Sequence, residues 1–417
     1  MATQSLINNE TTIQVKSVLQ KFQKGYTDKN IDNIDDYIND LFVKDDNIIT
    51  IGTSRSEWCI GLEECKGLIE SDWKYWGDLV INYQNAKINS KGDTAWFLTD
   101  CALSWDSEDD FDEWCEDLVA DYFQENGRYI NYKQFSKMAM LNIKLALLIK
   151  SSQCNKGKNI PFPIRLSGTL IRTNDRWLIN KLHFWVPMSS YPEWRIDTDN
   201  TDSIKYYNQI VQRMSKLNNE YNNQSCECIR ELLNALKENY LNKKSDILDT
   251  VKNLFVTYAD IYIVDPNEIP VAIGMDNIEK MIQIQREKWD DMELNIKESI
   301  INKEGDTANI ITTGIFKKCS TSEQLLQREW NNIKETLQKE GKGEDKLFQV
   351  QKQIAYALKE LSFGKEAMWE FRFDAVAVKV DDIWRFHNVQ FTYPSLYVLE
   401  GNYDMIPLLN DNVDKQS

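Results

Sequence analysis

The chain has 417 residues, enough for two or three domains that each bury a core, and its 42% hydrophobic share is typical of a folded protein. Its formal charge of −16 argues against nucleic acid and anionic membranes as partners, because both bind basic surfaces. No run of roughly 18 to 20 uncharged apolar residues occurs, and the start of the chain lacks a secretion signal. We therefore expect a cytoplasmic protein whose eight cysteines are reduced.

The predicted elements follow one order twice along the chain. Each copy has two helices with helical spacing of apolar residues, a short β-branched strand, an Ile-Gly pair before a third helix, and then two strands, an insert and two long strands. In the first copy these elements lie at residues 12–28, 34–41, 47–51, 65–76, 80–88, 94–105, 164–172 and 176–186. In the second they include 226–243, 247–254, 260–264, 278–289, 371–379 and 384–393.

An internal repeat relates the two copies. Shifting the chain by 213 residues places Ile60-Gly61 on Ile273-Gly274 and Gly92-Asp93-Thr94-Ala95 on Gly305-Asp306-Thr307-Ala308. A shift of 207 residues places Trp177 on Trp384 farther along. The chain is therefore predicted to contain one domain twice, because self-similarity at a fixed period is the signature of a duplication.

The repeat sets the predicted domain limits. We expect a first domain at residues 10–197, a polar linker at 198–225 and a second domain at 226–404. The insert of each domain, at about 106–160 and about 318–366, is charged and is predicted to be helical. Glycine in the Gly92-Asp93 and Gly305-Asp306 turns supplies the positive φ that a tight hairpin needs.

This order of elements resembles the SnoaL-like and ketosteroid-isomerase-like domains of the nuclear-transport-factor-2-like superfamily. The residues that carry the likeness are Gly61 and Gly274, the Gly-Asp-Thr-Ala hairpins, and the closing strands that begin at Arg176 and Trp384. The resemblance implies an α+β fold in which each domain is a cone: a curved antiparallel sheet wrapped on N-terminal helices, with a pocket at the open end. It also implies a possible pairing of the two domains as an intramolecular pseudo-dimer, because members of this family commonly dimerise through the sheet.

Asp265 is the leading catalytic candidate. Ketosteroid-isomerase-like members carry their proton-abstracting carboxylate in an Asp-Pro pair, and Asp265-Pro266 resembles it, with Gly274 eight residues beyond the proline. A buried carboxylate with a raised pKa can act as a general base. The alternative is an ordinary turn, since Asp-Pro often opens one. The first copy has Gly52-Thr53 at this place and cannot share the mechanism.

His387 is the second catalytic candidate. It shares strand parity with Phe391, which predicts the inward face unless a bulge intervenes, whereas His183 is predicted to face outward. A hydrogen-bonded core histidine is the alternative. Arg165 and Arg372 occupy matched strand positions, where an outward salt bridge is favoured over a carboxylate-binding role.

Aromatic and polar residues at matched positions are predicted to line the ligand pockets. They are Tyr240, Tyr262, Arg286, Trp289 and Phe391 in the second copy and Trp76 and Phe184 in the first. Two histidines in different copies and no paired cysteine motifs predict no metal site, and no phosphate-binding loop or other cofactor motif is present.

Three functions remain open from the sequence. The first is binding of a small hydrophobic or amphipathic ligand in the cone pocket. The second is an isomerase, cyclase or dehydratase that uses acid–base residues of the second domain, and the third is a protein-interaction module. An exposed apolar face on the inserts would favour the third.

Overall fold

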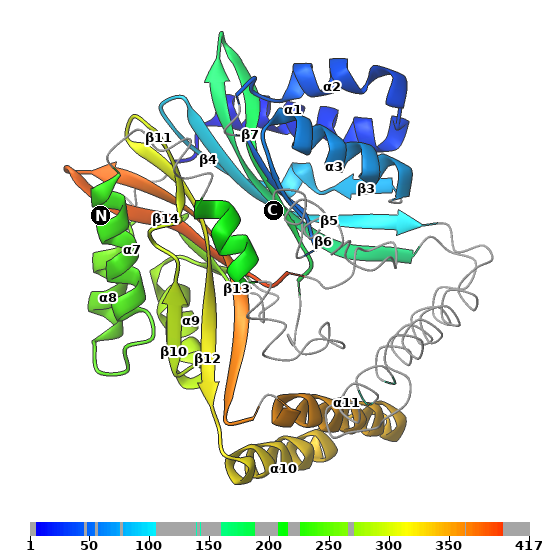
Figure 1. Cartoon of the computed structure of the whole chain (residues 1–417), viewed down its shortest axis with the longest axis vertical. Helices are drawn as coiled ribbons and strands as arrows, with labels where there is room; N and C mark the ends of the chain where they lie inside the picture. The colour runs from blue at the N-terminus through cyan, green and yellow to red at the C-terminus, as the bar shows by residue number, and fades with distance from the viewer. Residues whose placement is uncertain are drawn as a thin grey trace, which may run out of the picture.

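The computed structural model describes residues 6–45, 48–54, 57–75, 78–105, 139, 142, 160–187, 207–215, 226–265, 271–362 and 364–394. These residues form two halves, each with a seven-stranded sheet and helices on one of its faces. In Figure 1 the two sheets lie in the middle, with α1–α3 outside one sheet and α7–α9 outside the other. The predicted α+β class is confirmed.

The first half contains helices and strands in the predicted order. They are α1 (Asn9–Asp28), η1 (Ile31–Asn33), α2 (Ile34–Leu41), β1 (Ile49–Ile51), β2 (Trp58–Ile60), α3 (Leu62–Tyr75), β3 (Asp78–Ile81), η2 (Tyr83–Asn85), β4 (Lys87–Lys91), β5 (Thr94–Trp105), β6 (Ile160–Thr173) and β7 (Arg176–Trp185). The strand order is β2-β1-β7-β6-β5-β3, with β4 also paired to β5. Most of the predicted first insert lies outside the described residues.

The second half repeats this arrangement. Its elements are α7 (Glu227–Asn239), α8 (Ile247–Leu254), β8 (Tyr262–Val264), β9 (Ala272–Ile273), α9 (Met275–Lys288), β10 (Asp291–Leu294), β11 (Ile300–Glu304), β12 (Thr307–Cys319), α10 (Ser322–Gln338), α11 (Gly343–Ser362), β13 (Glu366–Val380) and β14 (Ile383–Thr392). The strand order is β10-β12-β13-β14-β8-β9, with β11 paired to β12. The helical second insert is therefore confirmed as α10 and α11.

The sheets are mostly antiparallel, as predicted, but each contains one parallel pair. Strand β1 pairs with β7 in parallel, and β8 pairs with β14 in parallel. The short β-branched strand of each copy therefore extends the sheet beside the closing strand. The order of helices and strands in the sequence did not indicate which strand this short strand would pair with.

The strand predicted at residues 80–88 is two short strands, β3 and β4, both paired with β5. The turn η2 separates them, and there the Thr99 hydroxyl donates to the carbonyl of Asn82 at 2.9 Å. The second half has the same break, with Thr312 donating to the carbonyl of Asn295 at 2.6 Å. A threonine in the long neighbouring strand thus satisfies a backbone group that the interrupted ladder leaves without a strand partner.

The tight turns form as predicted. Gly92 and Gly305 have φ values of 59° and 58° between the paired strands. The turns at Asn174-Asp175 and Asp381-Asp382 have positive φ at both residues, the conformation of a type I′ hairpin. These turns fix the register of the long strands in both halves.

The two sheets contact each other through a buried polar layer. Lys181 of β7 forms an ion pair with Asp374 of β13, and the exposed fractions of the two side chains are 4% and 1%. His183 lies 3.4 Å from Asp374 and 3.1 Å from the Thr392 hydroxyl. Each of these contacts joins the first half to the second.

Other contacts between the halves surround that layer. Thr94 and Thr307, which are matched by the repeat, meet at 2.9 Å between their hydroxyl oxygens. Arg372 donates to the backbone carbonyls of Gly52 and Ser54. Near the start of the chain, the Leu6 amide donates to Asp260 at 3.0 Å, while its carbonyl accepts from Ser90 at 2.9 Å.

Part of the predicted linker is packed against both halves. Residues 207–215 are helical, and Tyr207, Ile210 and Met214 are buried. Ile210 and Met214 belong to a cluster with Ile49, Ile51 and Trp58 of the first half and Ile311 of the second. The predicted domain limits themselves stay predictions. None of the described helices is both long and apolar enough to cross a bilayer.

Candidate functional site

Aromatic side chains fill the space between helices and sheet in the second half. Trp289 is stacked on Phe316 at 5.1 Å between ring centroids. Tyr240 lies 5.1 Å from Phe391, which also contacts Phe316 at 5.4 Å. The predicted pocket residues Tyr240, Trp289 and Phe391 are therefore brought together, as parts of a packed core.

Asp265 lies at the end of β8 and is 2% exposed. Burial first, and then the Asp265 carboxylate, raise the pKa of the Tyr240 hydroxyl well above its usual value. Neither that hydroxyl nor the Gln285 carboxamide has a hydrogen-bond partner among the described residues. In the first half the matched position of Gln285 is Asp72, and the Tyr26 hydroxyl donates to it at 2.6 Å. The tyrosine hydroxyl is therefore hydrogen-bonded to a neighbouring side chain in the first core, whereas the Tyr240 hydroxyl has no such bond in the second.

Arg286 has a structural role. Its guanidinium donates to the backbone carbonyls of Tyr240, Asn239 and Ser245 at 3.0, 2.9 and 2.8 Å, and to the hydroxyls of Ser245 and Thr250. These bonds cap the end of α7 and hold the loop that leads to α8. The side chain is 4% exposed, so its donors are committed to this loop.

His387 points into the contact between the sheets. The ladder between β13 and β14 shifts register between Val376 and Ala377, and this bulge moves His387 off the inward face that strand parity predicted. The Trp96 indole donates to Nδ1 of His387 at 3.2 Å, and Nε2 lies 3.4 Å from Asp260. Asp265 affects the pKa of Tyr240, whereas His387 contacts Trp96 and Asp260, so the two predicted catalytic residues do not form one acid–base pair.

The remaining predicted residues separate into different environments. Tyr262 lies in the contact between the halves, in a cluster with Leu98 and Trp185. Phe184 is in the first core, 6.3 Å from Phe22. Trp76 lies outside the described residues. Arg165 forms a salt bridge with Asp100 at 2.9 Å, the alternative that the sequence favoured.

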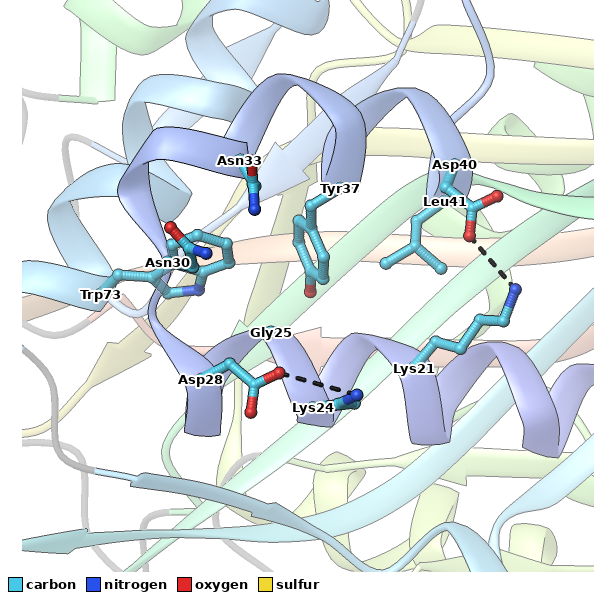
Figure 2. A pocket seen from close by; sticks show the side chains of 10 residues that line it. All are labelled: Lys21, Lys24, Gly25, Asp28, Asn30, Asn33, Tyr37, Asp40, Leu41 and Trp73. Carbon is cyan, nitrogen blue, oxygen red and sulfur yellow. Dashed lines mark hydrogen bonds and ion pairs between the residues drawn. The ribbon is translucent and has the colours of Figure 1, made fainter.

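An open groove lies between α1 and α2 in the first half (Figure 2), with a volume of about 330 Å³. No sequence pattern predicted this groove. Its floor includes Gly25, Tyr37 and Trp73, and the Tyr37 and Trp73 rings meet edge to face at 5.0 Å. A β-carbon on Gly25 would lie 2.2 Å from the Tyr37 ring, so this glycine permits the close approach of the two helices.

The two ends of the groove differ in chemistry. Figure 2 shows Asn30 and Asn33 beside Trp73 at one end and the Lys21–Asp40 ion pair at the other. Burial alone would raise the pKa of Asp40, but Lys21 and Arg176 outweigh burial and lower it. Lys24 and Asp28, 3.8 Å apart, line the α1 side. The groove thus joins an aromatic and amide surface to paired charges.

The repeat places a second groove at the same position of the second half. It has about 430 Å³ and is lined by residues that include Lys243, Asp246 and Arg286. These match Asn30, Asn33 and Trp73 of the first groove under the 213-residue shift. Because Arg286 replaces Trp73, the second groove lacks that aromatic floor. The difference between Trp73 and Arg286 was the sequence signal that could have drawn attention to this position.

The described residues include no group of three or more His, Cys, Asp or Glu side chains placed to hold a metal ion. The polar groups described above are carboxylates, amides, hydroxyls, lysines, arginines and histidines. Their chemistry is hydrogen bonding, ion pairing and proton exchange.

The first half contains a match to a known domain family. Residues 15–113 match the family model described as a SnoaL-like domain. The resemblance that the sequence predicted is confirmed over this stretch, and the fold of helices on a mixed sheet agrees with it. No curated protein matches the chain in sequence.

The solved structures to which the chain is similar include two bacterial proteins. One is an NTF2-like protein of unknown function from Pseudomonas putida KT2440, at 9% identity, covering 45% of this chain and 94% of that one, with a TM-score of 0.29. Another is an NTF2-like superfamily protein from Salmonella enterica serovar Typhimurium LT2, at 13% identity, 42% and 94% coverage and a TM-score of 0.28. The S. rosetta CaMKII hub is similar at 9% identity, 41% and 97% coverage and a TM-score of 0.26.

Proposed function

We propose that this protein binds a small amphipathic molecule, and that the groove between α1 and α2 holds it. The observation that carries the proposal is a groove of about 330 Å³ whose lining includes the half-buried ring of Tyr37 and the edge of the Trp73 ring, which is 5% exposed. This volume lies within the range of small-molecule sites. The core of each half, where the sequence placed the pocket, is filled by its own aromatic side chains.

The chemistry of the groove favours a ring with a polar or charged substituent. A ring would pack against Tyr37 and Trp73, and its hydrogen-bonding groups would meet the amides of Asn30 and Asn33. A charged substituent would reach the Lys21–Asp40 pair, whose side chains are 59% and 47% exposed. Exchange of one partner in an exposed pair costs little free energy, because such pairs are worth about 0 to 1 kcal/mol.

Ligand-observed NMR with a panel of aromatic carboxylates, aromatic amines and monosaccharides tests this proposal. Asn33→Trp fills the groove from an exposed position at the end of η1, so binding should be lost. Asn39→Trp is the matched control, because Asn39 is exposed on the adjoining helix α2 and does not line the groove. Compounds that bind the wild type and Asn33→Trp equally well would contradict the proposal.

An acid–base enzyme in the second half is the second candidate. It is favoured by the buried Asp265, whose carboxylate contributes to the raised pKa of the Tyr240 hydroxyl, and by the buried Gln285. Turnover of an isomerase or dehydratase substrate that Asp265→Asn abolishes and Asn33→Trp leaves intact would favour this candidate over the groove.

We also propose that the two halves act as a pseudo-dimer within one chain. The buried Lys181–Asp374 pair and the hydrogen bond from Trp96 to His387 support the pairing. In this arrangement the first half supplies the groove, and the second half supports its sheet.

A further inference from the structure

The hairpin of α10 and α11 is an ordered helical unit at the ends of β12 and β13 (Figure 1). A capping box of Thr321 and Gln324 begins α10. Between the helices, Gln353 donates to the Thr336 hydroxyl at 2.9 Å, and Arg328 pairs with Glu360 at 2.6 Å. These pairs show that the helices run antiparallel and that polar contacts join them at their shared seam, while Leu325, Ala355 and Ala357 are buried.

One side of this hairpin is apolar and exposed. Its large exposed residues are Leu326, Trp330, Leu337, Leu347 and Ile354, with exposed fractions of 58%, 55%, 47%, 66% and 47%. On α10 the first three are separated by four and seven residues, and on α11 the other two by seven, so each set follows one helix face. We call these five residues the hairpin face.

The exposed apolar residues of α10 and those of α11 lie on the same side of the hairpin. Ile354 directly follows the seam residue Gln353, and Leu337 directly follows the seam residue Thr336. A step of one residue rotates each side chain by about 100° around its helix. Because the helices are antiparallel, equal rotations from the seam bring both stripes to one side, which creates a two-helix apolar surface.

The charge of the hairpin differs from that of the chain. Residues 321–362 hold seven acidic and seven basic side chains, whereas the whole chain has a formal charge of −16. Two copies of a strongly acidic protein repel each other over most of their surface. At the neutral hairpin two copies can approach with less repulsion than at surfaces that carry the net negative charge.

Among the described residues, the facing sides of the two sheets already contact each other, whereas the hairpin face is exposed. Lys181, His183 and Trp96 of the first sheet are already engaged with the second. A large apolar surface marks an interaction site, and identical stripes can pack on each other across a two-fold axis. We propose that a second copy of this chain binds the hairpin face, so that two hairpins form a four-helix bundle.

Sedimentation velocity of the full chain from low to high micromolar concentration tests this proposal. The wild type is expected to form a species of twice the 48.9 kDa chain mass at high concentration. Trp330→Glu and, separately, Leu347→Glu should each raise the dissociation constant at least about thirtyfold, because central aromatic and apolar anchors contribute about 2 kcal/mol or more.

Ile13→Glu is the matched control, since Ile13 is 70% exposed on α1, away from the hairpin. It should leave the dimer intact, and far-UV circular dichroism should show that all three variants fold. A wild type that stays monomeric overturns the proposal and assigns the hairpin face to another occupant. A dimer that survives both hairpin variants, or that only Ile13→Glu dissociates, also overturns it.

Discussion

Lys181 and Asp374 form an ion pair that is buried away from water. Burial alone would raise the pKa of the Asp374 carboxyl, but Lys181 and His183 reverse this and lower it. Desolvation makes such a pair a weak net source of stability, yet the loss of one partner is costly because it leaves a buried charge.

Lys181→Met is therefore expected to lower the free energy of unfolding by about 3 to 5 kcal/mol. The double variant Lys181→Met with Asp374→Leu removes both charges and should recover most of that loss. Urea unfolding of the wild type, each single variant and the double variant measures the coupling. Additive losses would show that the two side chains do not depend on each other.

Both histidines of the chain lie buried between the sheets. Burial lowers the pKa of His183, which Asp374 partly opposes, and lowers the pKa of His387, which Asp260 partly opposes. A histidine whose pKa is lower in the folded state is neutral there, so protonation favours unfolding. The stability it contributes is complete above the unfolded pKa of about 6.5 and is lost as the pH falls toward the folded pKa.

The melting temperature is thus expected to fall between pH 7.5 and pH 5.5. Each histidine contributes up to about 1.4 kcal/mol per pH unit in this window. In His387→Gln the fall should be smaller, because one of the two protonation sites is gone. Thermal unfolding at both pH values measures this, and a variant with the same or a larger fall would contradict the role of His387.

At the scale of elements, glycine controls the contact between α1 and α2. Gly25 lies where Tyr37 crosses α1, and any β-carbon there would overlap the ring. Alanine is the better helix former by about 1 kcal/mol, but the overlap acts against it. Tyr37 also donates to the carbonyl of Phe22 at 2.8 Å, which holds its ring in place. We therefore expect the steric overlap to outweigh the gain in helix propensity.

Gly25→Ala is expected to lower the free energy of unfolding by about 1 to 3 kcal/mol, the usual cost of overpacking. Gly67→Ala on α3 is the control. A β-carbon at Gly67 meets no atom within 4 Å, so helix propensity should raise stability by up to about 1 kcal/mol. Urea unfolding compares the two, and equal effects would show that the Tyr37 contact does not limit this position.

The order of elements could be predicted from the sequence because local signals agree. Turn glycines, helical spacing and the repeat all indicated the same strands and helices, and Gly92 and Gly305 adopt the expected positive φ. Strand parity failed at His387, since a bulge depends on how the strand closes against its neighbours. The parallel pairing of β1 with β7 was missed because partner choice is a long-range property.

At the scale of the whole molecule, the two halves meet through unlike residues. Under the 207-residue shift, Lys181 corresponds to Asn388 and Asp374 corresponds to Ser167. A pairing of two first halves would leave the lysine buried without its carboxylate, and a pairing of two second halves would leave the aspartate without its lysine. The charge pair therefore favours the pairing of a first half with a second half.

The candidate site could be predicted only in part at this scale. The sequence identified aromatic residues, but it could not show that Trp289 and Phe391 would fill their own core. Nor could it show that the exposed space lies outside, between α1 and α2. Cavities are the space left over after packing, and packing depends on contacts from all elements at once.

The most direct test of the proposed function is ¹⁹F NMR of the protein labelled with 5-fluorotryptophan, titrated with a ring compound that binds. Trp73→Phe and Trp289→Phe assign the two resonances of interest. We predict that the Trp73 signal shifts with saturation while the Trp289 signal does not, because Trp73 lines the groove and Trp289 is packed on Phe316. A saturable shift of Trp289 without one of Trp73 would place the ligand in the second core and contradict the account.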